Sequence, residues 1–119
     1  MDRLKLLIVE DEALIALQMK MKLRRAGFDV CESAISGAEA ITLSRSEKPD
    51  VILMDIRLAG EMDGIEAARQ IGGFSPARII FTTGNSDSAT TARAMDLSPA
   101  AFLIKPVEVQ SIMRVLQKV

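Results

Sequence analysis

The sequence Leu6-Leu7-Ile8-Val9-Glu10-Asp11 joins a short apolar run to a pair of acids, and the same plan recurs three times along the chain. The other runs are Val51-Ile52-Leu53-Met54, followed by Asp55; Ile79-Ile80-Phe81, followed closely by Thr83; and Phe102-Leu103-Ile104, followed by Lys105. Each run is continuously apolar rather than alternating, which is typical of a parallel strand that is covered on both faces. Helical patterns separate the runs, so the sequence predicts an α/β fold with a doubly wound parallel sheet.

The polar residues that follow the four runs are expected to meet in space. Right-handed crossovers bring the carboxyl ends of parallel strands to one edge of the sheet, and ligands bind in the crevice at that edge. The sequence therefore predicts a single site that contains Glu10, Asp11, Asp55, Thr83 and Lys105.

The segments between the runs carry helix signals. Gly27 is a C-terminal signal for the first helix, and Ser36 is an N-cap signal for the second. We expect helices over 12–25, 65–71, 86–95 and 107–119, and one further strand over 28–34. A further helix is expected after Ser36, running through Ala38, Ala40, Ile41 and Leu43, in a unit that Pro49-Asp50 ends. The helix over 86–95 is expected to be weak because the segment is rich in serine and threonine.

Length and composition indicate one small domain. The chain has 119 residues, of which 49% are hydrophobic, and this is enough for one core and too little for two. A formal net charge of -1 means that the chain has no excess of basic residues, so we expect no direct nucleic-acid partner. Cys31 is the one cysteine and the chain has no histidine, so we expect a buried structural thiol rather than a disulfide or a zinc site. Neither a membrane-spanning run nor a signal-peptide pattern is found, which predicts a cytoplasmic protein with no membrane partner.

The acids point to a divalent cation. Three carboxylates held within about 5 Å of one another repel by about 3 kcal/mol per pair at an effective dielectric near 20, unless a cation neutralises them. Oxygen ligands without histidine or a second cysteine favour Mg²⁺ over zinc. The alternatives are ordinary capping roles, in which Glu10 or Asp11 caps the first helix and Asp55 caps a loop.

The lysine and the threonine suggest an anion beside these acids. Lys105 stands between a strand and Pro106, from where its ammonium can pair with a carboxylate or a phosphoryl oxygen. Thr83 offers a hydroxyl next to Gly84, whose missing side chain leaves room for a bulky anion. The alternatives are a surface lysine and a plain Thr-Gly turn.

With these residues in this order, the chain resembles the receiver domains of two-component response regulators, of the chemotaxis-regulator type, over essentially all 119 residues. The resemblance rests on Leu7-Ile8-Val9-Glu10-Asp11-Glu12, Pro49-Asp50-Val51-Ile52-Leu53-Met54-Asp55, Met62-Asp63-Gly64, Thr83-Gly84 and Phe102-Leu103-Ile104-Lys105-Pro106. It implies a single receiver domain over 1–119 with a flavodoxin-like, three-layer α/β/α fold. Its five parallel strands would lie in the order 2-1-3-4-5.

The resemblance also implies a chemistry. Asp55 would accept a phosphoryl group from a sensor histidine kinase or a phosphotransfer protein, in a signalling domain that catalyses its own phosphorylation and dephosphorylation without being a metabolic enzyme. The ligands of Mg²⁺ would be Glu10, Asp11, Asp55 and the backbone carbonyl of Arg57. Lys105 and Thr83 would hold the phosphoryl oxygens, helped by backbone N–H groups near Arg57 and Gly84, and a cis bond between Lys105 and Pro106 would aim the lysine.

A switch is implied as well. Phosphorylation would draw Thr83 inward and let Phe102 fill the space, which would change the face made by the fourth helix, fifth strand and fifth helix. That face would choose an output partner or domain, and it is also where a homodimer could form. The alternative for Phe102 is plain core packing.

Some features depart from the family pattern. The loop 57–64 is one residue longer than usual and has Ala59 where a proline is common. Arg57 and Asn85 occupy the positions that flank the phosphoryl group, so we expect them to tune its lifetime. Two other functions are considered: an aspartyl-phosphate enzyme of the haloacid-dehalogenase type, which would need an acid at the position of Arg57, and a pseudo-receiver that binds partners without phosphorylation.

Overall fold

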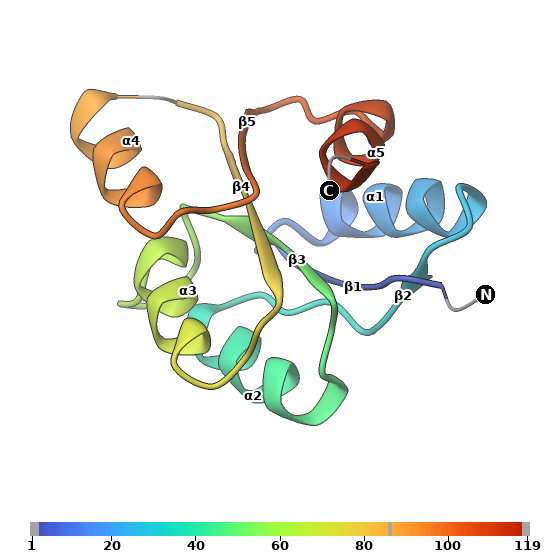
Figure 1. The fold of residues 1–119 in the computed structure, drawn as a ribbon, viewed down its shortest axis with the longest axis horizontal. Helices are drawn as coiled ribbons and strands as arrows, with labels where there is room; N and C mark the ends of the chain where they lie inside the picture. Colours follow the sequence, from blue (N-terminus) through green and yellow to red (C-terminus); the bar gives the residue numbers. More distant parts are fainter. Residues whose placement is uncertain (1–2, 86, 118–119) are drawn as a thin grey trace.

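Strands and helices alternate along the chain in the computed structural model, which describes residues 3–85 and 87–117 (Figure 1). The strands are β1 (Lys5–Val9), β2 (Asp29–Val30), β3 (Val51–Asp55), β4 (Arg78–Thr83) and β5 (Ala101–Ile104). The helices are α1 (Ala13–Arg25), α2 (Gly37–Glu47), α3 (Gly64–Gly72), α4 (Ser88–Met95) and α5 (Val109–Gln117).

The strands form one parallel sheet in the order β2-β1-β3-β4-β5. Helices α1 and α5 lie on one side of the sheet and α2, α3 and α4 on the other, so the molecule has three layers (Figure 1). The prediction of a doubly wound, flavodoxin-like α/β/α fold with strand order 2-1-3-4-5 is confirmed.

Two apolar cores fill the space between the layers, because successive strand residues point to opposite faces. The α1/α5 core contains Ile8 and Leu53, together with Leu23 of α1 and Ile112 of α5. The α2/α3/α4 core contains the alternate strand residues, including Phe81, and side chains from α2, α3 and α4. Burial on both faces explains why the strands are continuously apolar in the sequence.

The strand expected over 28–34 is shorter in the structure. Only Asp29 and Val30 pair continuously with β1, and the chain rejoins the sheet at Ala34, which forms an isolated bridge to Val9. Cys31 N and Ala34 N still donate to carbonyls of β1, while the residues between them leave the ladder. This departure is tolerated because β2 is an edge strand with no neighbour on its outer side.

Two helices also begin two residues later than expected, and α1 begins one residue later because Glu12 is its N-cap. Helix α5 starts at Val109 rather than at 107, because Val107 packs against the α1/α5 core and the Glu108 carbonyl accepts the first helical hydrogen bonds. Helix α4 starts at Ser88, since Asp87 is its N-cap and accepts a 2.8 Å hydrogen bond from Thr90 N. The expected first residue, Ser86, lies outside the described residues.

Ser36 caps α2 as predicted, with its hydroxyl accepting a hydrogen bond from Glu39 N at 3.2 Å. We expect Ser36→Ala to lower the free energy of unfolding by about 1 kcal/mol, because a backbone donor loses its partner. Urea unfolding would measure this loss. Ser46→Ala in the last turn of the same helix is the matched control, and an equal loss in both variants would argue against a capping effect.

Cys31 is a buried free thiol, as expected. Burial raises the pKa of this thiol, which keeps it protonated, and its Sγ donates to the Leu6 carbonyl at 3.3 Å. Among the described residues, no helix is both long and apolar enough to cross a membrane.

Candidate functional site

The predicted site residues all lie at the carboxyl edge of the sheet, and the acids and Lys105 come together there. Glu10 directly follows β1, Asp55 is the last residue of β3, Thr83 is the last residue of β4, and Lys105 directly follows β5. Three of them also share a face. Glu10, Asp55 and Lys105 stand two residues beyond Ile8, Leu53 and Leu103 respectively, and those three apolar side chains belong to or pack against the α1/α5 core.

An acidic cluster forms the centre of the site. Carboxylate oxygens of Glu10, Asp11 and Asp55 all lie within 4.8 Å of one another. Glu10 and Asp55 are each 4% exposed, whereas Asp11 is exposed. Neither Glu10 nor Asp11 is the N-cap of α1; that residue is Glu12, whose backbone N–H donates to Glu10 at 3.2 Å. Three oxygen donors at this spacing, two buried and one open to solvent, fit a hard cation such as Mg²⁺.

Lys105 supplies the positive charge in this structure. Its Nζ donates to Glu10 Oε1 at 2.7 Å and to Asp55 Oδ2 at 2.8 Å. Burial lowers the pKa of this lysine, but the hydrogen bonds to Asp55 and Glu10 outweigh burial and leave the pKa above its ordinary value of 10.5. The bond from Lys105 to Pro106 is cis, as predicted. Lys105 is therefore not a free surface lysine, since it links the ends of β1 and β3.

The second oxygen of Asp55 is held by the loop after β3. Arg57 N donates to Asp55 Oδ1 at 3.2 Å, so the loop-capping role considered as an alternative for Asp55 is present as well. The two roles are compatible because a carboxylate has acceptor sites on both oxygens. The orientation of the Asp55 carboxylate is therefore fixed by Lys105 at one oxygen and by Arg57 N at the other.

Thr83 points to the other side of the sheet. It stands two residues beyond Phe81 of the α2/α3/α4 core, which is also where Phe102 packs, half-buried. The Thr83 hydroxyl donates to the Asn85 carbonyl at 2.7 Å and accepts from Asn85 N at 3.2 Å, so the β4–α4 turn holds it. At Gly84 an added Cβ would meet no atom within 4 Å, so the turn is open there.

A polar cavity of about 380 Å³ lies between the loops that follow β3 and β4. Its lining includes Arg57, Thr83 and Asn85. Arg93 on α4 also lines it and forms a 3.1 Å ion pair with Asp63, the N-cap of α3. An anion in this cavity would lie beside Thr83 and Arg57.

One sterically constrained position beside the site was not identified from the sequence. A Cβ built on Gly64, the first residue of α3, would lie 2.0 Å from the backbone oxygen of Asp55. Gly64 N also donates to the Ile56 carbonyl at 2.8 Å, so the helix start is fixed against the end of β3. The Asp63-Gly64 pair indicated only a helix start, and the contact depends on how the loop 57–64 folds back.

Residues 6–117 match the family model of the response regulator receiver domain. The chain belongs to this family. Transcriptional regulatory protein PdtaR of Mycobacterium tuberculosis is 34% identical to the chain over 113 residues, which cover 95% of this chain and 55% of PdtaR. The chain thus spans about half the length of that relative. Chemotaxis protein CheY of Thermotoga maritima is 32% identical over 116 residues, which cover 97% of this chain and 96% of CheY.

Solved receiver structures share the fold. The signal receiver domain of a modulated diguanylate cyclase from Desulfovibrio desulfuricans superposes with a TM-score of 0.90 at 34% identity, covering 98% of this chain and 92% of that one. A response regulator from Burkholderia pseudomallei, described with a phosphorylated aspartic acid, a calcium ion and citrate, superposes with a TM-score of 0.88 at 30% identity. That match covers 98% of this chain and 68% of the other.

Proposed function

We propose that the chain is a phospho-accepting receiver domain of a two-component system or phosphorelay, and that Asp55 is the phosphoacceptor. The observation that carries the proposal is the position of Asp55: its carboxylate is 4% exposed at the carboxyl end of β3, beside two other acids and in contact with Lys105. The phosphorylated aspartic acid in the Burkholderia relative supports the same chemistry. The chain is thereby a signalling domain rather than a metabolic enzyme.

In phosphoryl transfer the protein mainly positions the reacting groups and stabilises their charge. A carboxylate oxygen of Asp55 forms a bond to phosphorus while the nitrogen–phosphorus bond of a partner's phosphohistidine breaks, and the bonding pair returns to the imidazole nitrogen. The chain has no histidine of its own, so the donor is a sensor histidine kinase, a phosphotransfer protein or a small acyl phosphate. Lys105 lies close enough to Asp55 Oδ2 to shift onto a phosphoryl oxygen and stabilise its charge.

The acids would hold a magnesium ion. Glu10, Asp11 and Asp55 supply the carboxylate oxygens, and the Arg57 carbonyl is proposed as a further ligand. A bound Mg²⁺ neutralises charge on the acids and on the phosphoryl oxygens. The calcium ion described for the Burkholderia relative is consistent with a cation in this fold.

Phosphorylation would also act as the switch. The new group adds nearly two negative charges, and the Thr83 hydroxyl would leave the Asn85 carbonyl to donate to a phosphoryl oxygen. Phe102, on the same side of the sheet, would take up the vacated space and alter the α4–β5–α5 face. Helix α4 is suited to move because only Ala94 is buried along it. This face would engage the output, or a second copy in a homodimer.

The proposal also covers the extent of the domain, its location and the residues that flank the phosphoryl group. The receiver would extend over 1–119 and work in the cytoplasm beside its kinase, with Arg57 and Asn85 tuning the phosphoryl lifetime. A haloacid-dehalogenase type of enzyme is disfavoured by Arg57 at the position of its second acid. A pseudo-receiver that acts without phosphorylation is the remaining alternative.

Intact-mass analysis after incubation with acetyl phosphate and Mg²⁺ tests the proposal. We expect a labile adduct of one phosphoryl group in the parent chain, none in Asp55→Asn, and none in the parent when EDTA removes the metal. Asp50→Asn, an exposed acid just before β3, is the matched control and should be labelled like the parent. A parent that binds Mg²⁺ but is never labelled would favour the pseudo-receiver.

A further inference from the structure

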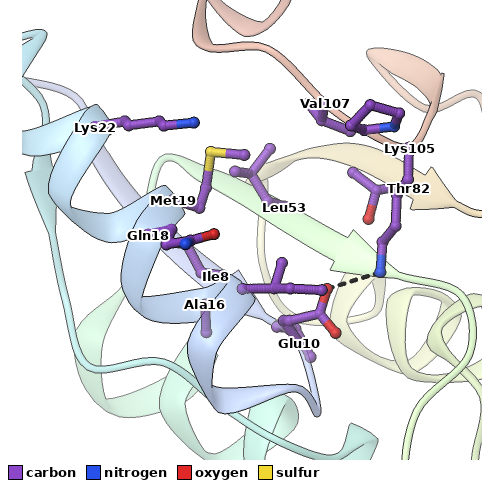
Figure 2. Close-up of a pocket in the computed structure, with 13 residues that line it drawn as sticks. Ile8, Glu10, Ala16, Gln18, Met19, Lys22, Leu53, Thr82, Lys105 and Val107 are labelled. Carbon is purple, nitrogen blue, oxygen red and sulfur yellow. Dashed lines mark hydrogen bonds and ion pairs between the residues drawn. The ribbon is translucent and has the colours of Figure 1, made fainter.

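An apolar cavity of about 400 Å³ lies beside the acidic cluster, between α1 and the segment that joins β5 to α5 (Figure 2). Ile8 and Leu53 of the sheet, Met19 of α1 and Val107 contribute side chains to its walls. Its volume falls within the range of about 300–1,000 Å³ that is usual for small-molecule sites. Glu10 and Lys105 line it but Asp55 and Thr83 do not, so the cavity adjoins the proposed phosphoryl site without containing the phosphoacceptor.

The two ends of the cavity are chemically different. At the inner end Glu10 and Lys105 face each other and form an ion pair (Figure 2). Because Lys105 is shared with Asp55, that end keeps a net negative charge and would not attract an anion. At the outer end Lys22 extends from α1, and a second, adjoining cavity of about 440 Å³ shares Lys22 and Val107 with the first and adds Arg25. Glu108 also lines the second cavity and is its one acid. Among residues 3–85 and 87–117, neither Lys22 nor Arg25 forms an ion pair.

We propose that this cavity is a second binding site, for a small amphipathic anion. The apolar body would fill the space between Met19, Leu53 and Val107, where burial of apolar area gives the affinity. The anionic group would lie at the outer end, beside Lys22 and Arg25.

Charge favours this occupant over a second copy of the chain. Helix α1 carries no acid and has four basic residues, namely Lys20, Lys22, Arg24 and Arg25. A two-fold contact through α1 and the cavity mouth would set these positive charges against each other. A cationic amphiphile would meet the same repulsion, which Glu108 offsets only in part.

Methyl NMR with decanoate as the probe, kept below its micellar concentration, tests the proposal. We expect saturable shifts of the Ile8, Met19, Leu53 and Val107 methyl groups. Decyltrimethylammonium, which has a chain of equal length and the opposite charge, should bind about twofold to fivefold more weakly, the size of effect expected from exposed charges. The double variant Lys22→Gln, Arg25→Gln should lose the preference for decanoate, whereas Lys20→Gln, which lines neither cavity, should keep it.

Three outcomes would overturn the proposal. Shifts that never saturate, or that fall on methyl groups of the α2/α3/α4 core such as Ile71, would show that the probe does not occupy the cavity. Equal affinities for decanoate and decyltrimethylammonium would show that Lys22 and Arg25 do not favour an anion over a cation. If decanoate does not bind at all, the cavity is not a site for amphipathic anions. The expected occupant would then be an apolar side chain of a docking partner.

Discussion

Gly64→Ala is expected to lower the free energy of unfolding by about 3 kcal/mol or more, which places it among the most damaging single substitutions. The added Cβ would lie 2.0 Å from the Asp55 backbone oxygen and 2.9 Å from Cγ of Met54. The nearer of these atoms is backbone, so no side-chain rotation can relieve the contact. The start of α3 would have to move away from β3, and the Gly64 N–H bond to Ile56 would be lost with it.

The same substitution tests whether Asp55 depends on this contact. Moving the end of β3 would shift the Asp55 carboxylate relative to Lys105, so labelling by acetyl phosphate should fall even in the fraction that remains folded. Gly72→Ala in the last turn of α3 is the control, because a Cβ there meets nothing within 4 Å and alanine should stabilise the helix by up to about 1 kcal/mol. Urea unfolding curves of the two variants give the comparison, and equal curves would contradict the steric argument.

The fold could be predicted from the sequence because its signal is repeated. Each buried strand is an apolar run such as Val51-Ile52-Leu53-Met54, and each run is bounded by turn or helix signals. The weak points were the edge strand β2 and the helix starts near 88 and 109. Those boundaries depend on single hydrogen bonds, such as that from Thr90 N to Asp87, rather than on a repeated pattern.

The acids and the lysine of the site could be predicted for a similar reason. In a parallel sheet, residues at the carboxyl ends of the strands share one edge, so Glu10, Asp55 and Lys105 were expected on the same side of the molecule. Because β4 separates β3 from β5, the contact also depends on the long side chain of Lys105. Strand alternation also decides that Lys105 reaches the acids while the Thr83 hydroxyl turns toward Asn85. The sequence indicated that these residues lie at one edge of the sheet. It did not indicate that Lys105 and Thr83 lie on opposite faces of the sheet.

Neither the contacts between loops nor the cavities could be predicted from the sequence. Gly64 meets Asp55 only because the loop 57–64 folds back onto the end of β3, and no local pattern encodes that path. The cavity between Met19 and Val107 depends on how far α1 stands from α5, which is set by the sum of many packed side chains. Features that depend on the distance between two helices, or between a loop and a strand, can be found only from coordinates.

The removal of Lys105 is also expected to destabilise the fold strongly. Lys105→Met keeps much of the side-chain length but leaves the buried carboxylates of Glu10 and Asp55 without their cation. Breaking a buried pair in this way costs about 3–5 kcal/mol, and because a quarter of the lysine side chain is exposed we expect a loss of about 2–3 kcal/mol. Lys5→Met, which removes the more exposed pair with Glu47, is the control and should cost less.

The pH dependence of this loss identifies its cause. The pKa of Lys105 is raised above 10.5 in the folded protein, so the stabilisation from its charge is complete below the unfolded value and disappears as the pH rises through the folded one. The difference in unfolding free energy between the parent and Lys105→Met should therefore stay constant from about pH 7 to 9.5 and shrink above about pH 10.5. A difference that persists unchanged at high pH would assign the loss to packing of the lysine stem instead.

Added Mg²⁺ gives an independent measurement of the same charge. In the parent, Lys105 already neutralises part of the acidic cluster, whereas in Lys105→Met the three acids face one another without a cation. Millimolar Mg²⁺ should consequently raise the unfolding free energy of the variant more than that of the parent, because ligand binding stabilises the state that binds it more tightly. The triple variant Glu10→Gln, Asp11→Asn, Lys105→Met should lose this response. If the parent and Lys105→Met respond equally, the lysine and the metal do not share the carboxylates, and the proposed use of Lys105 as a movable cation for the phosphoryl group fails with it.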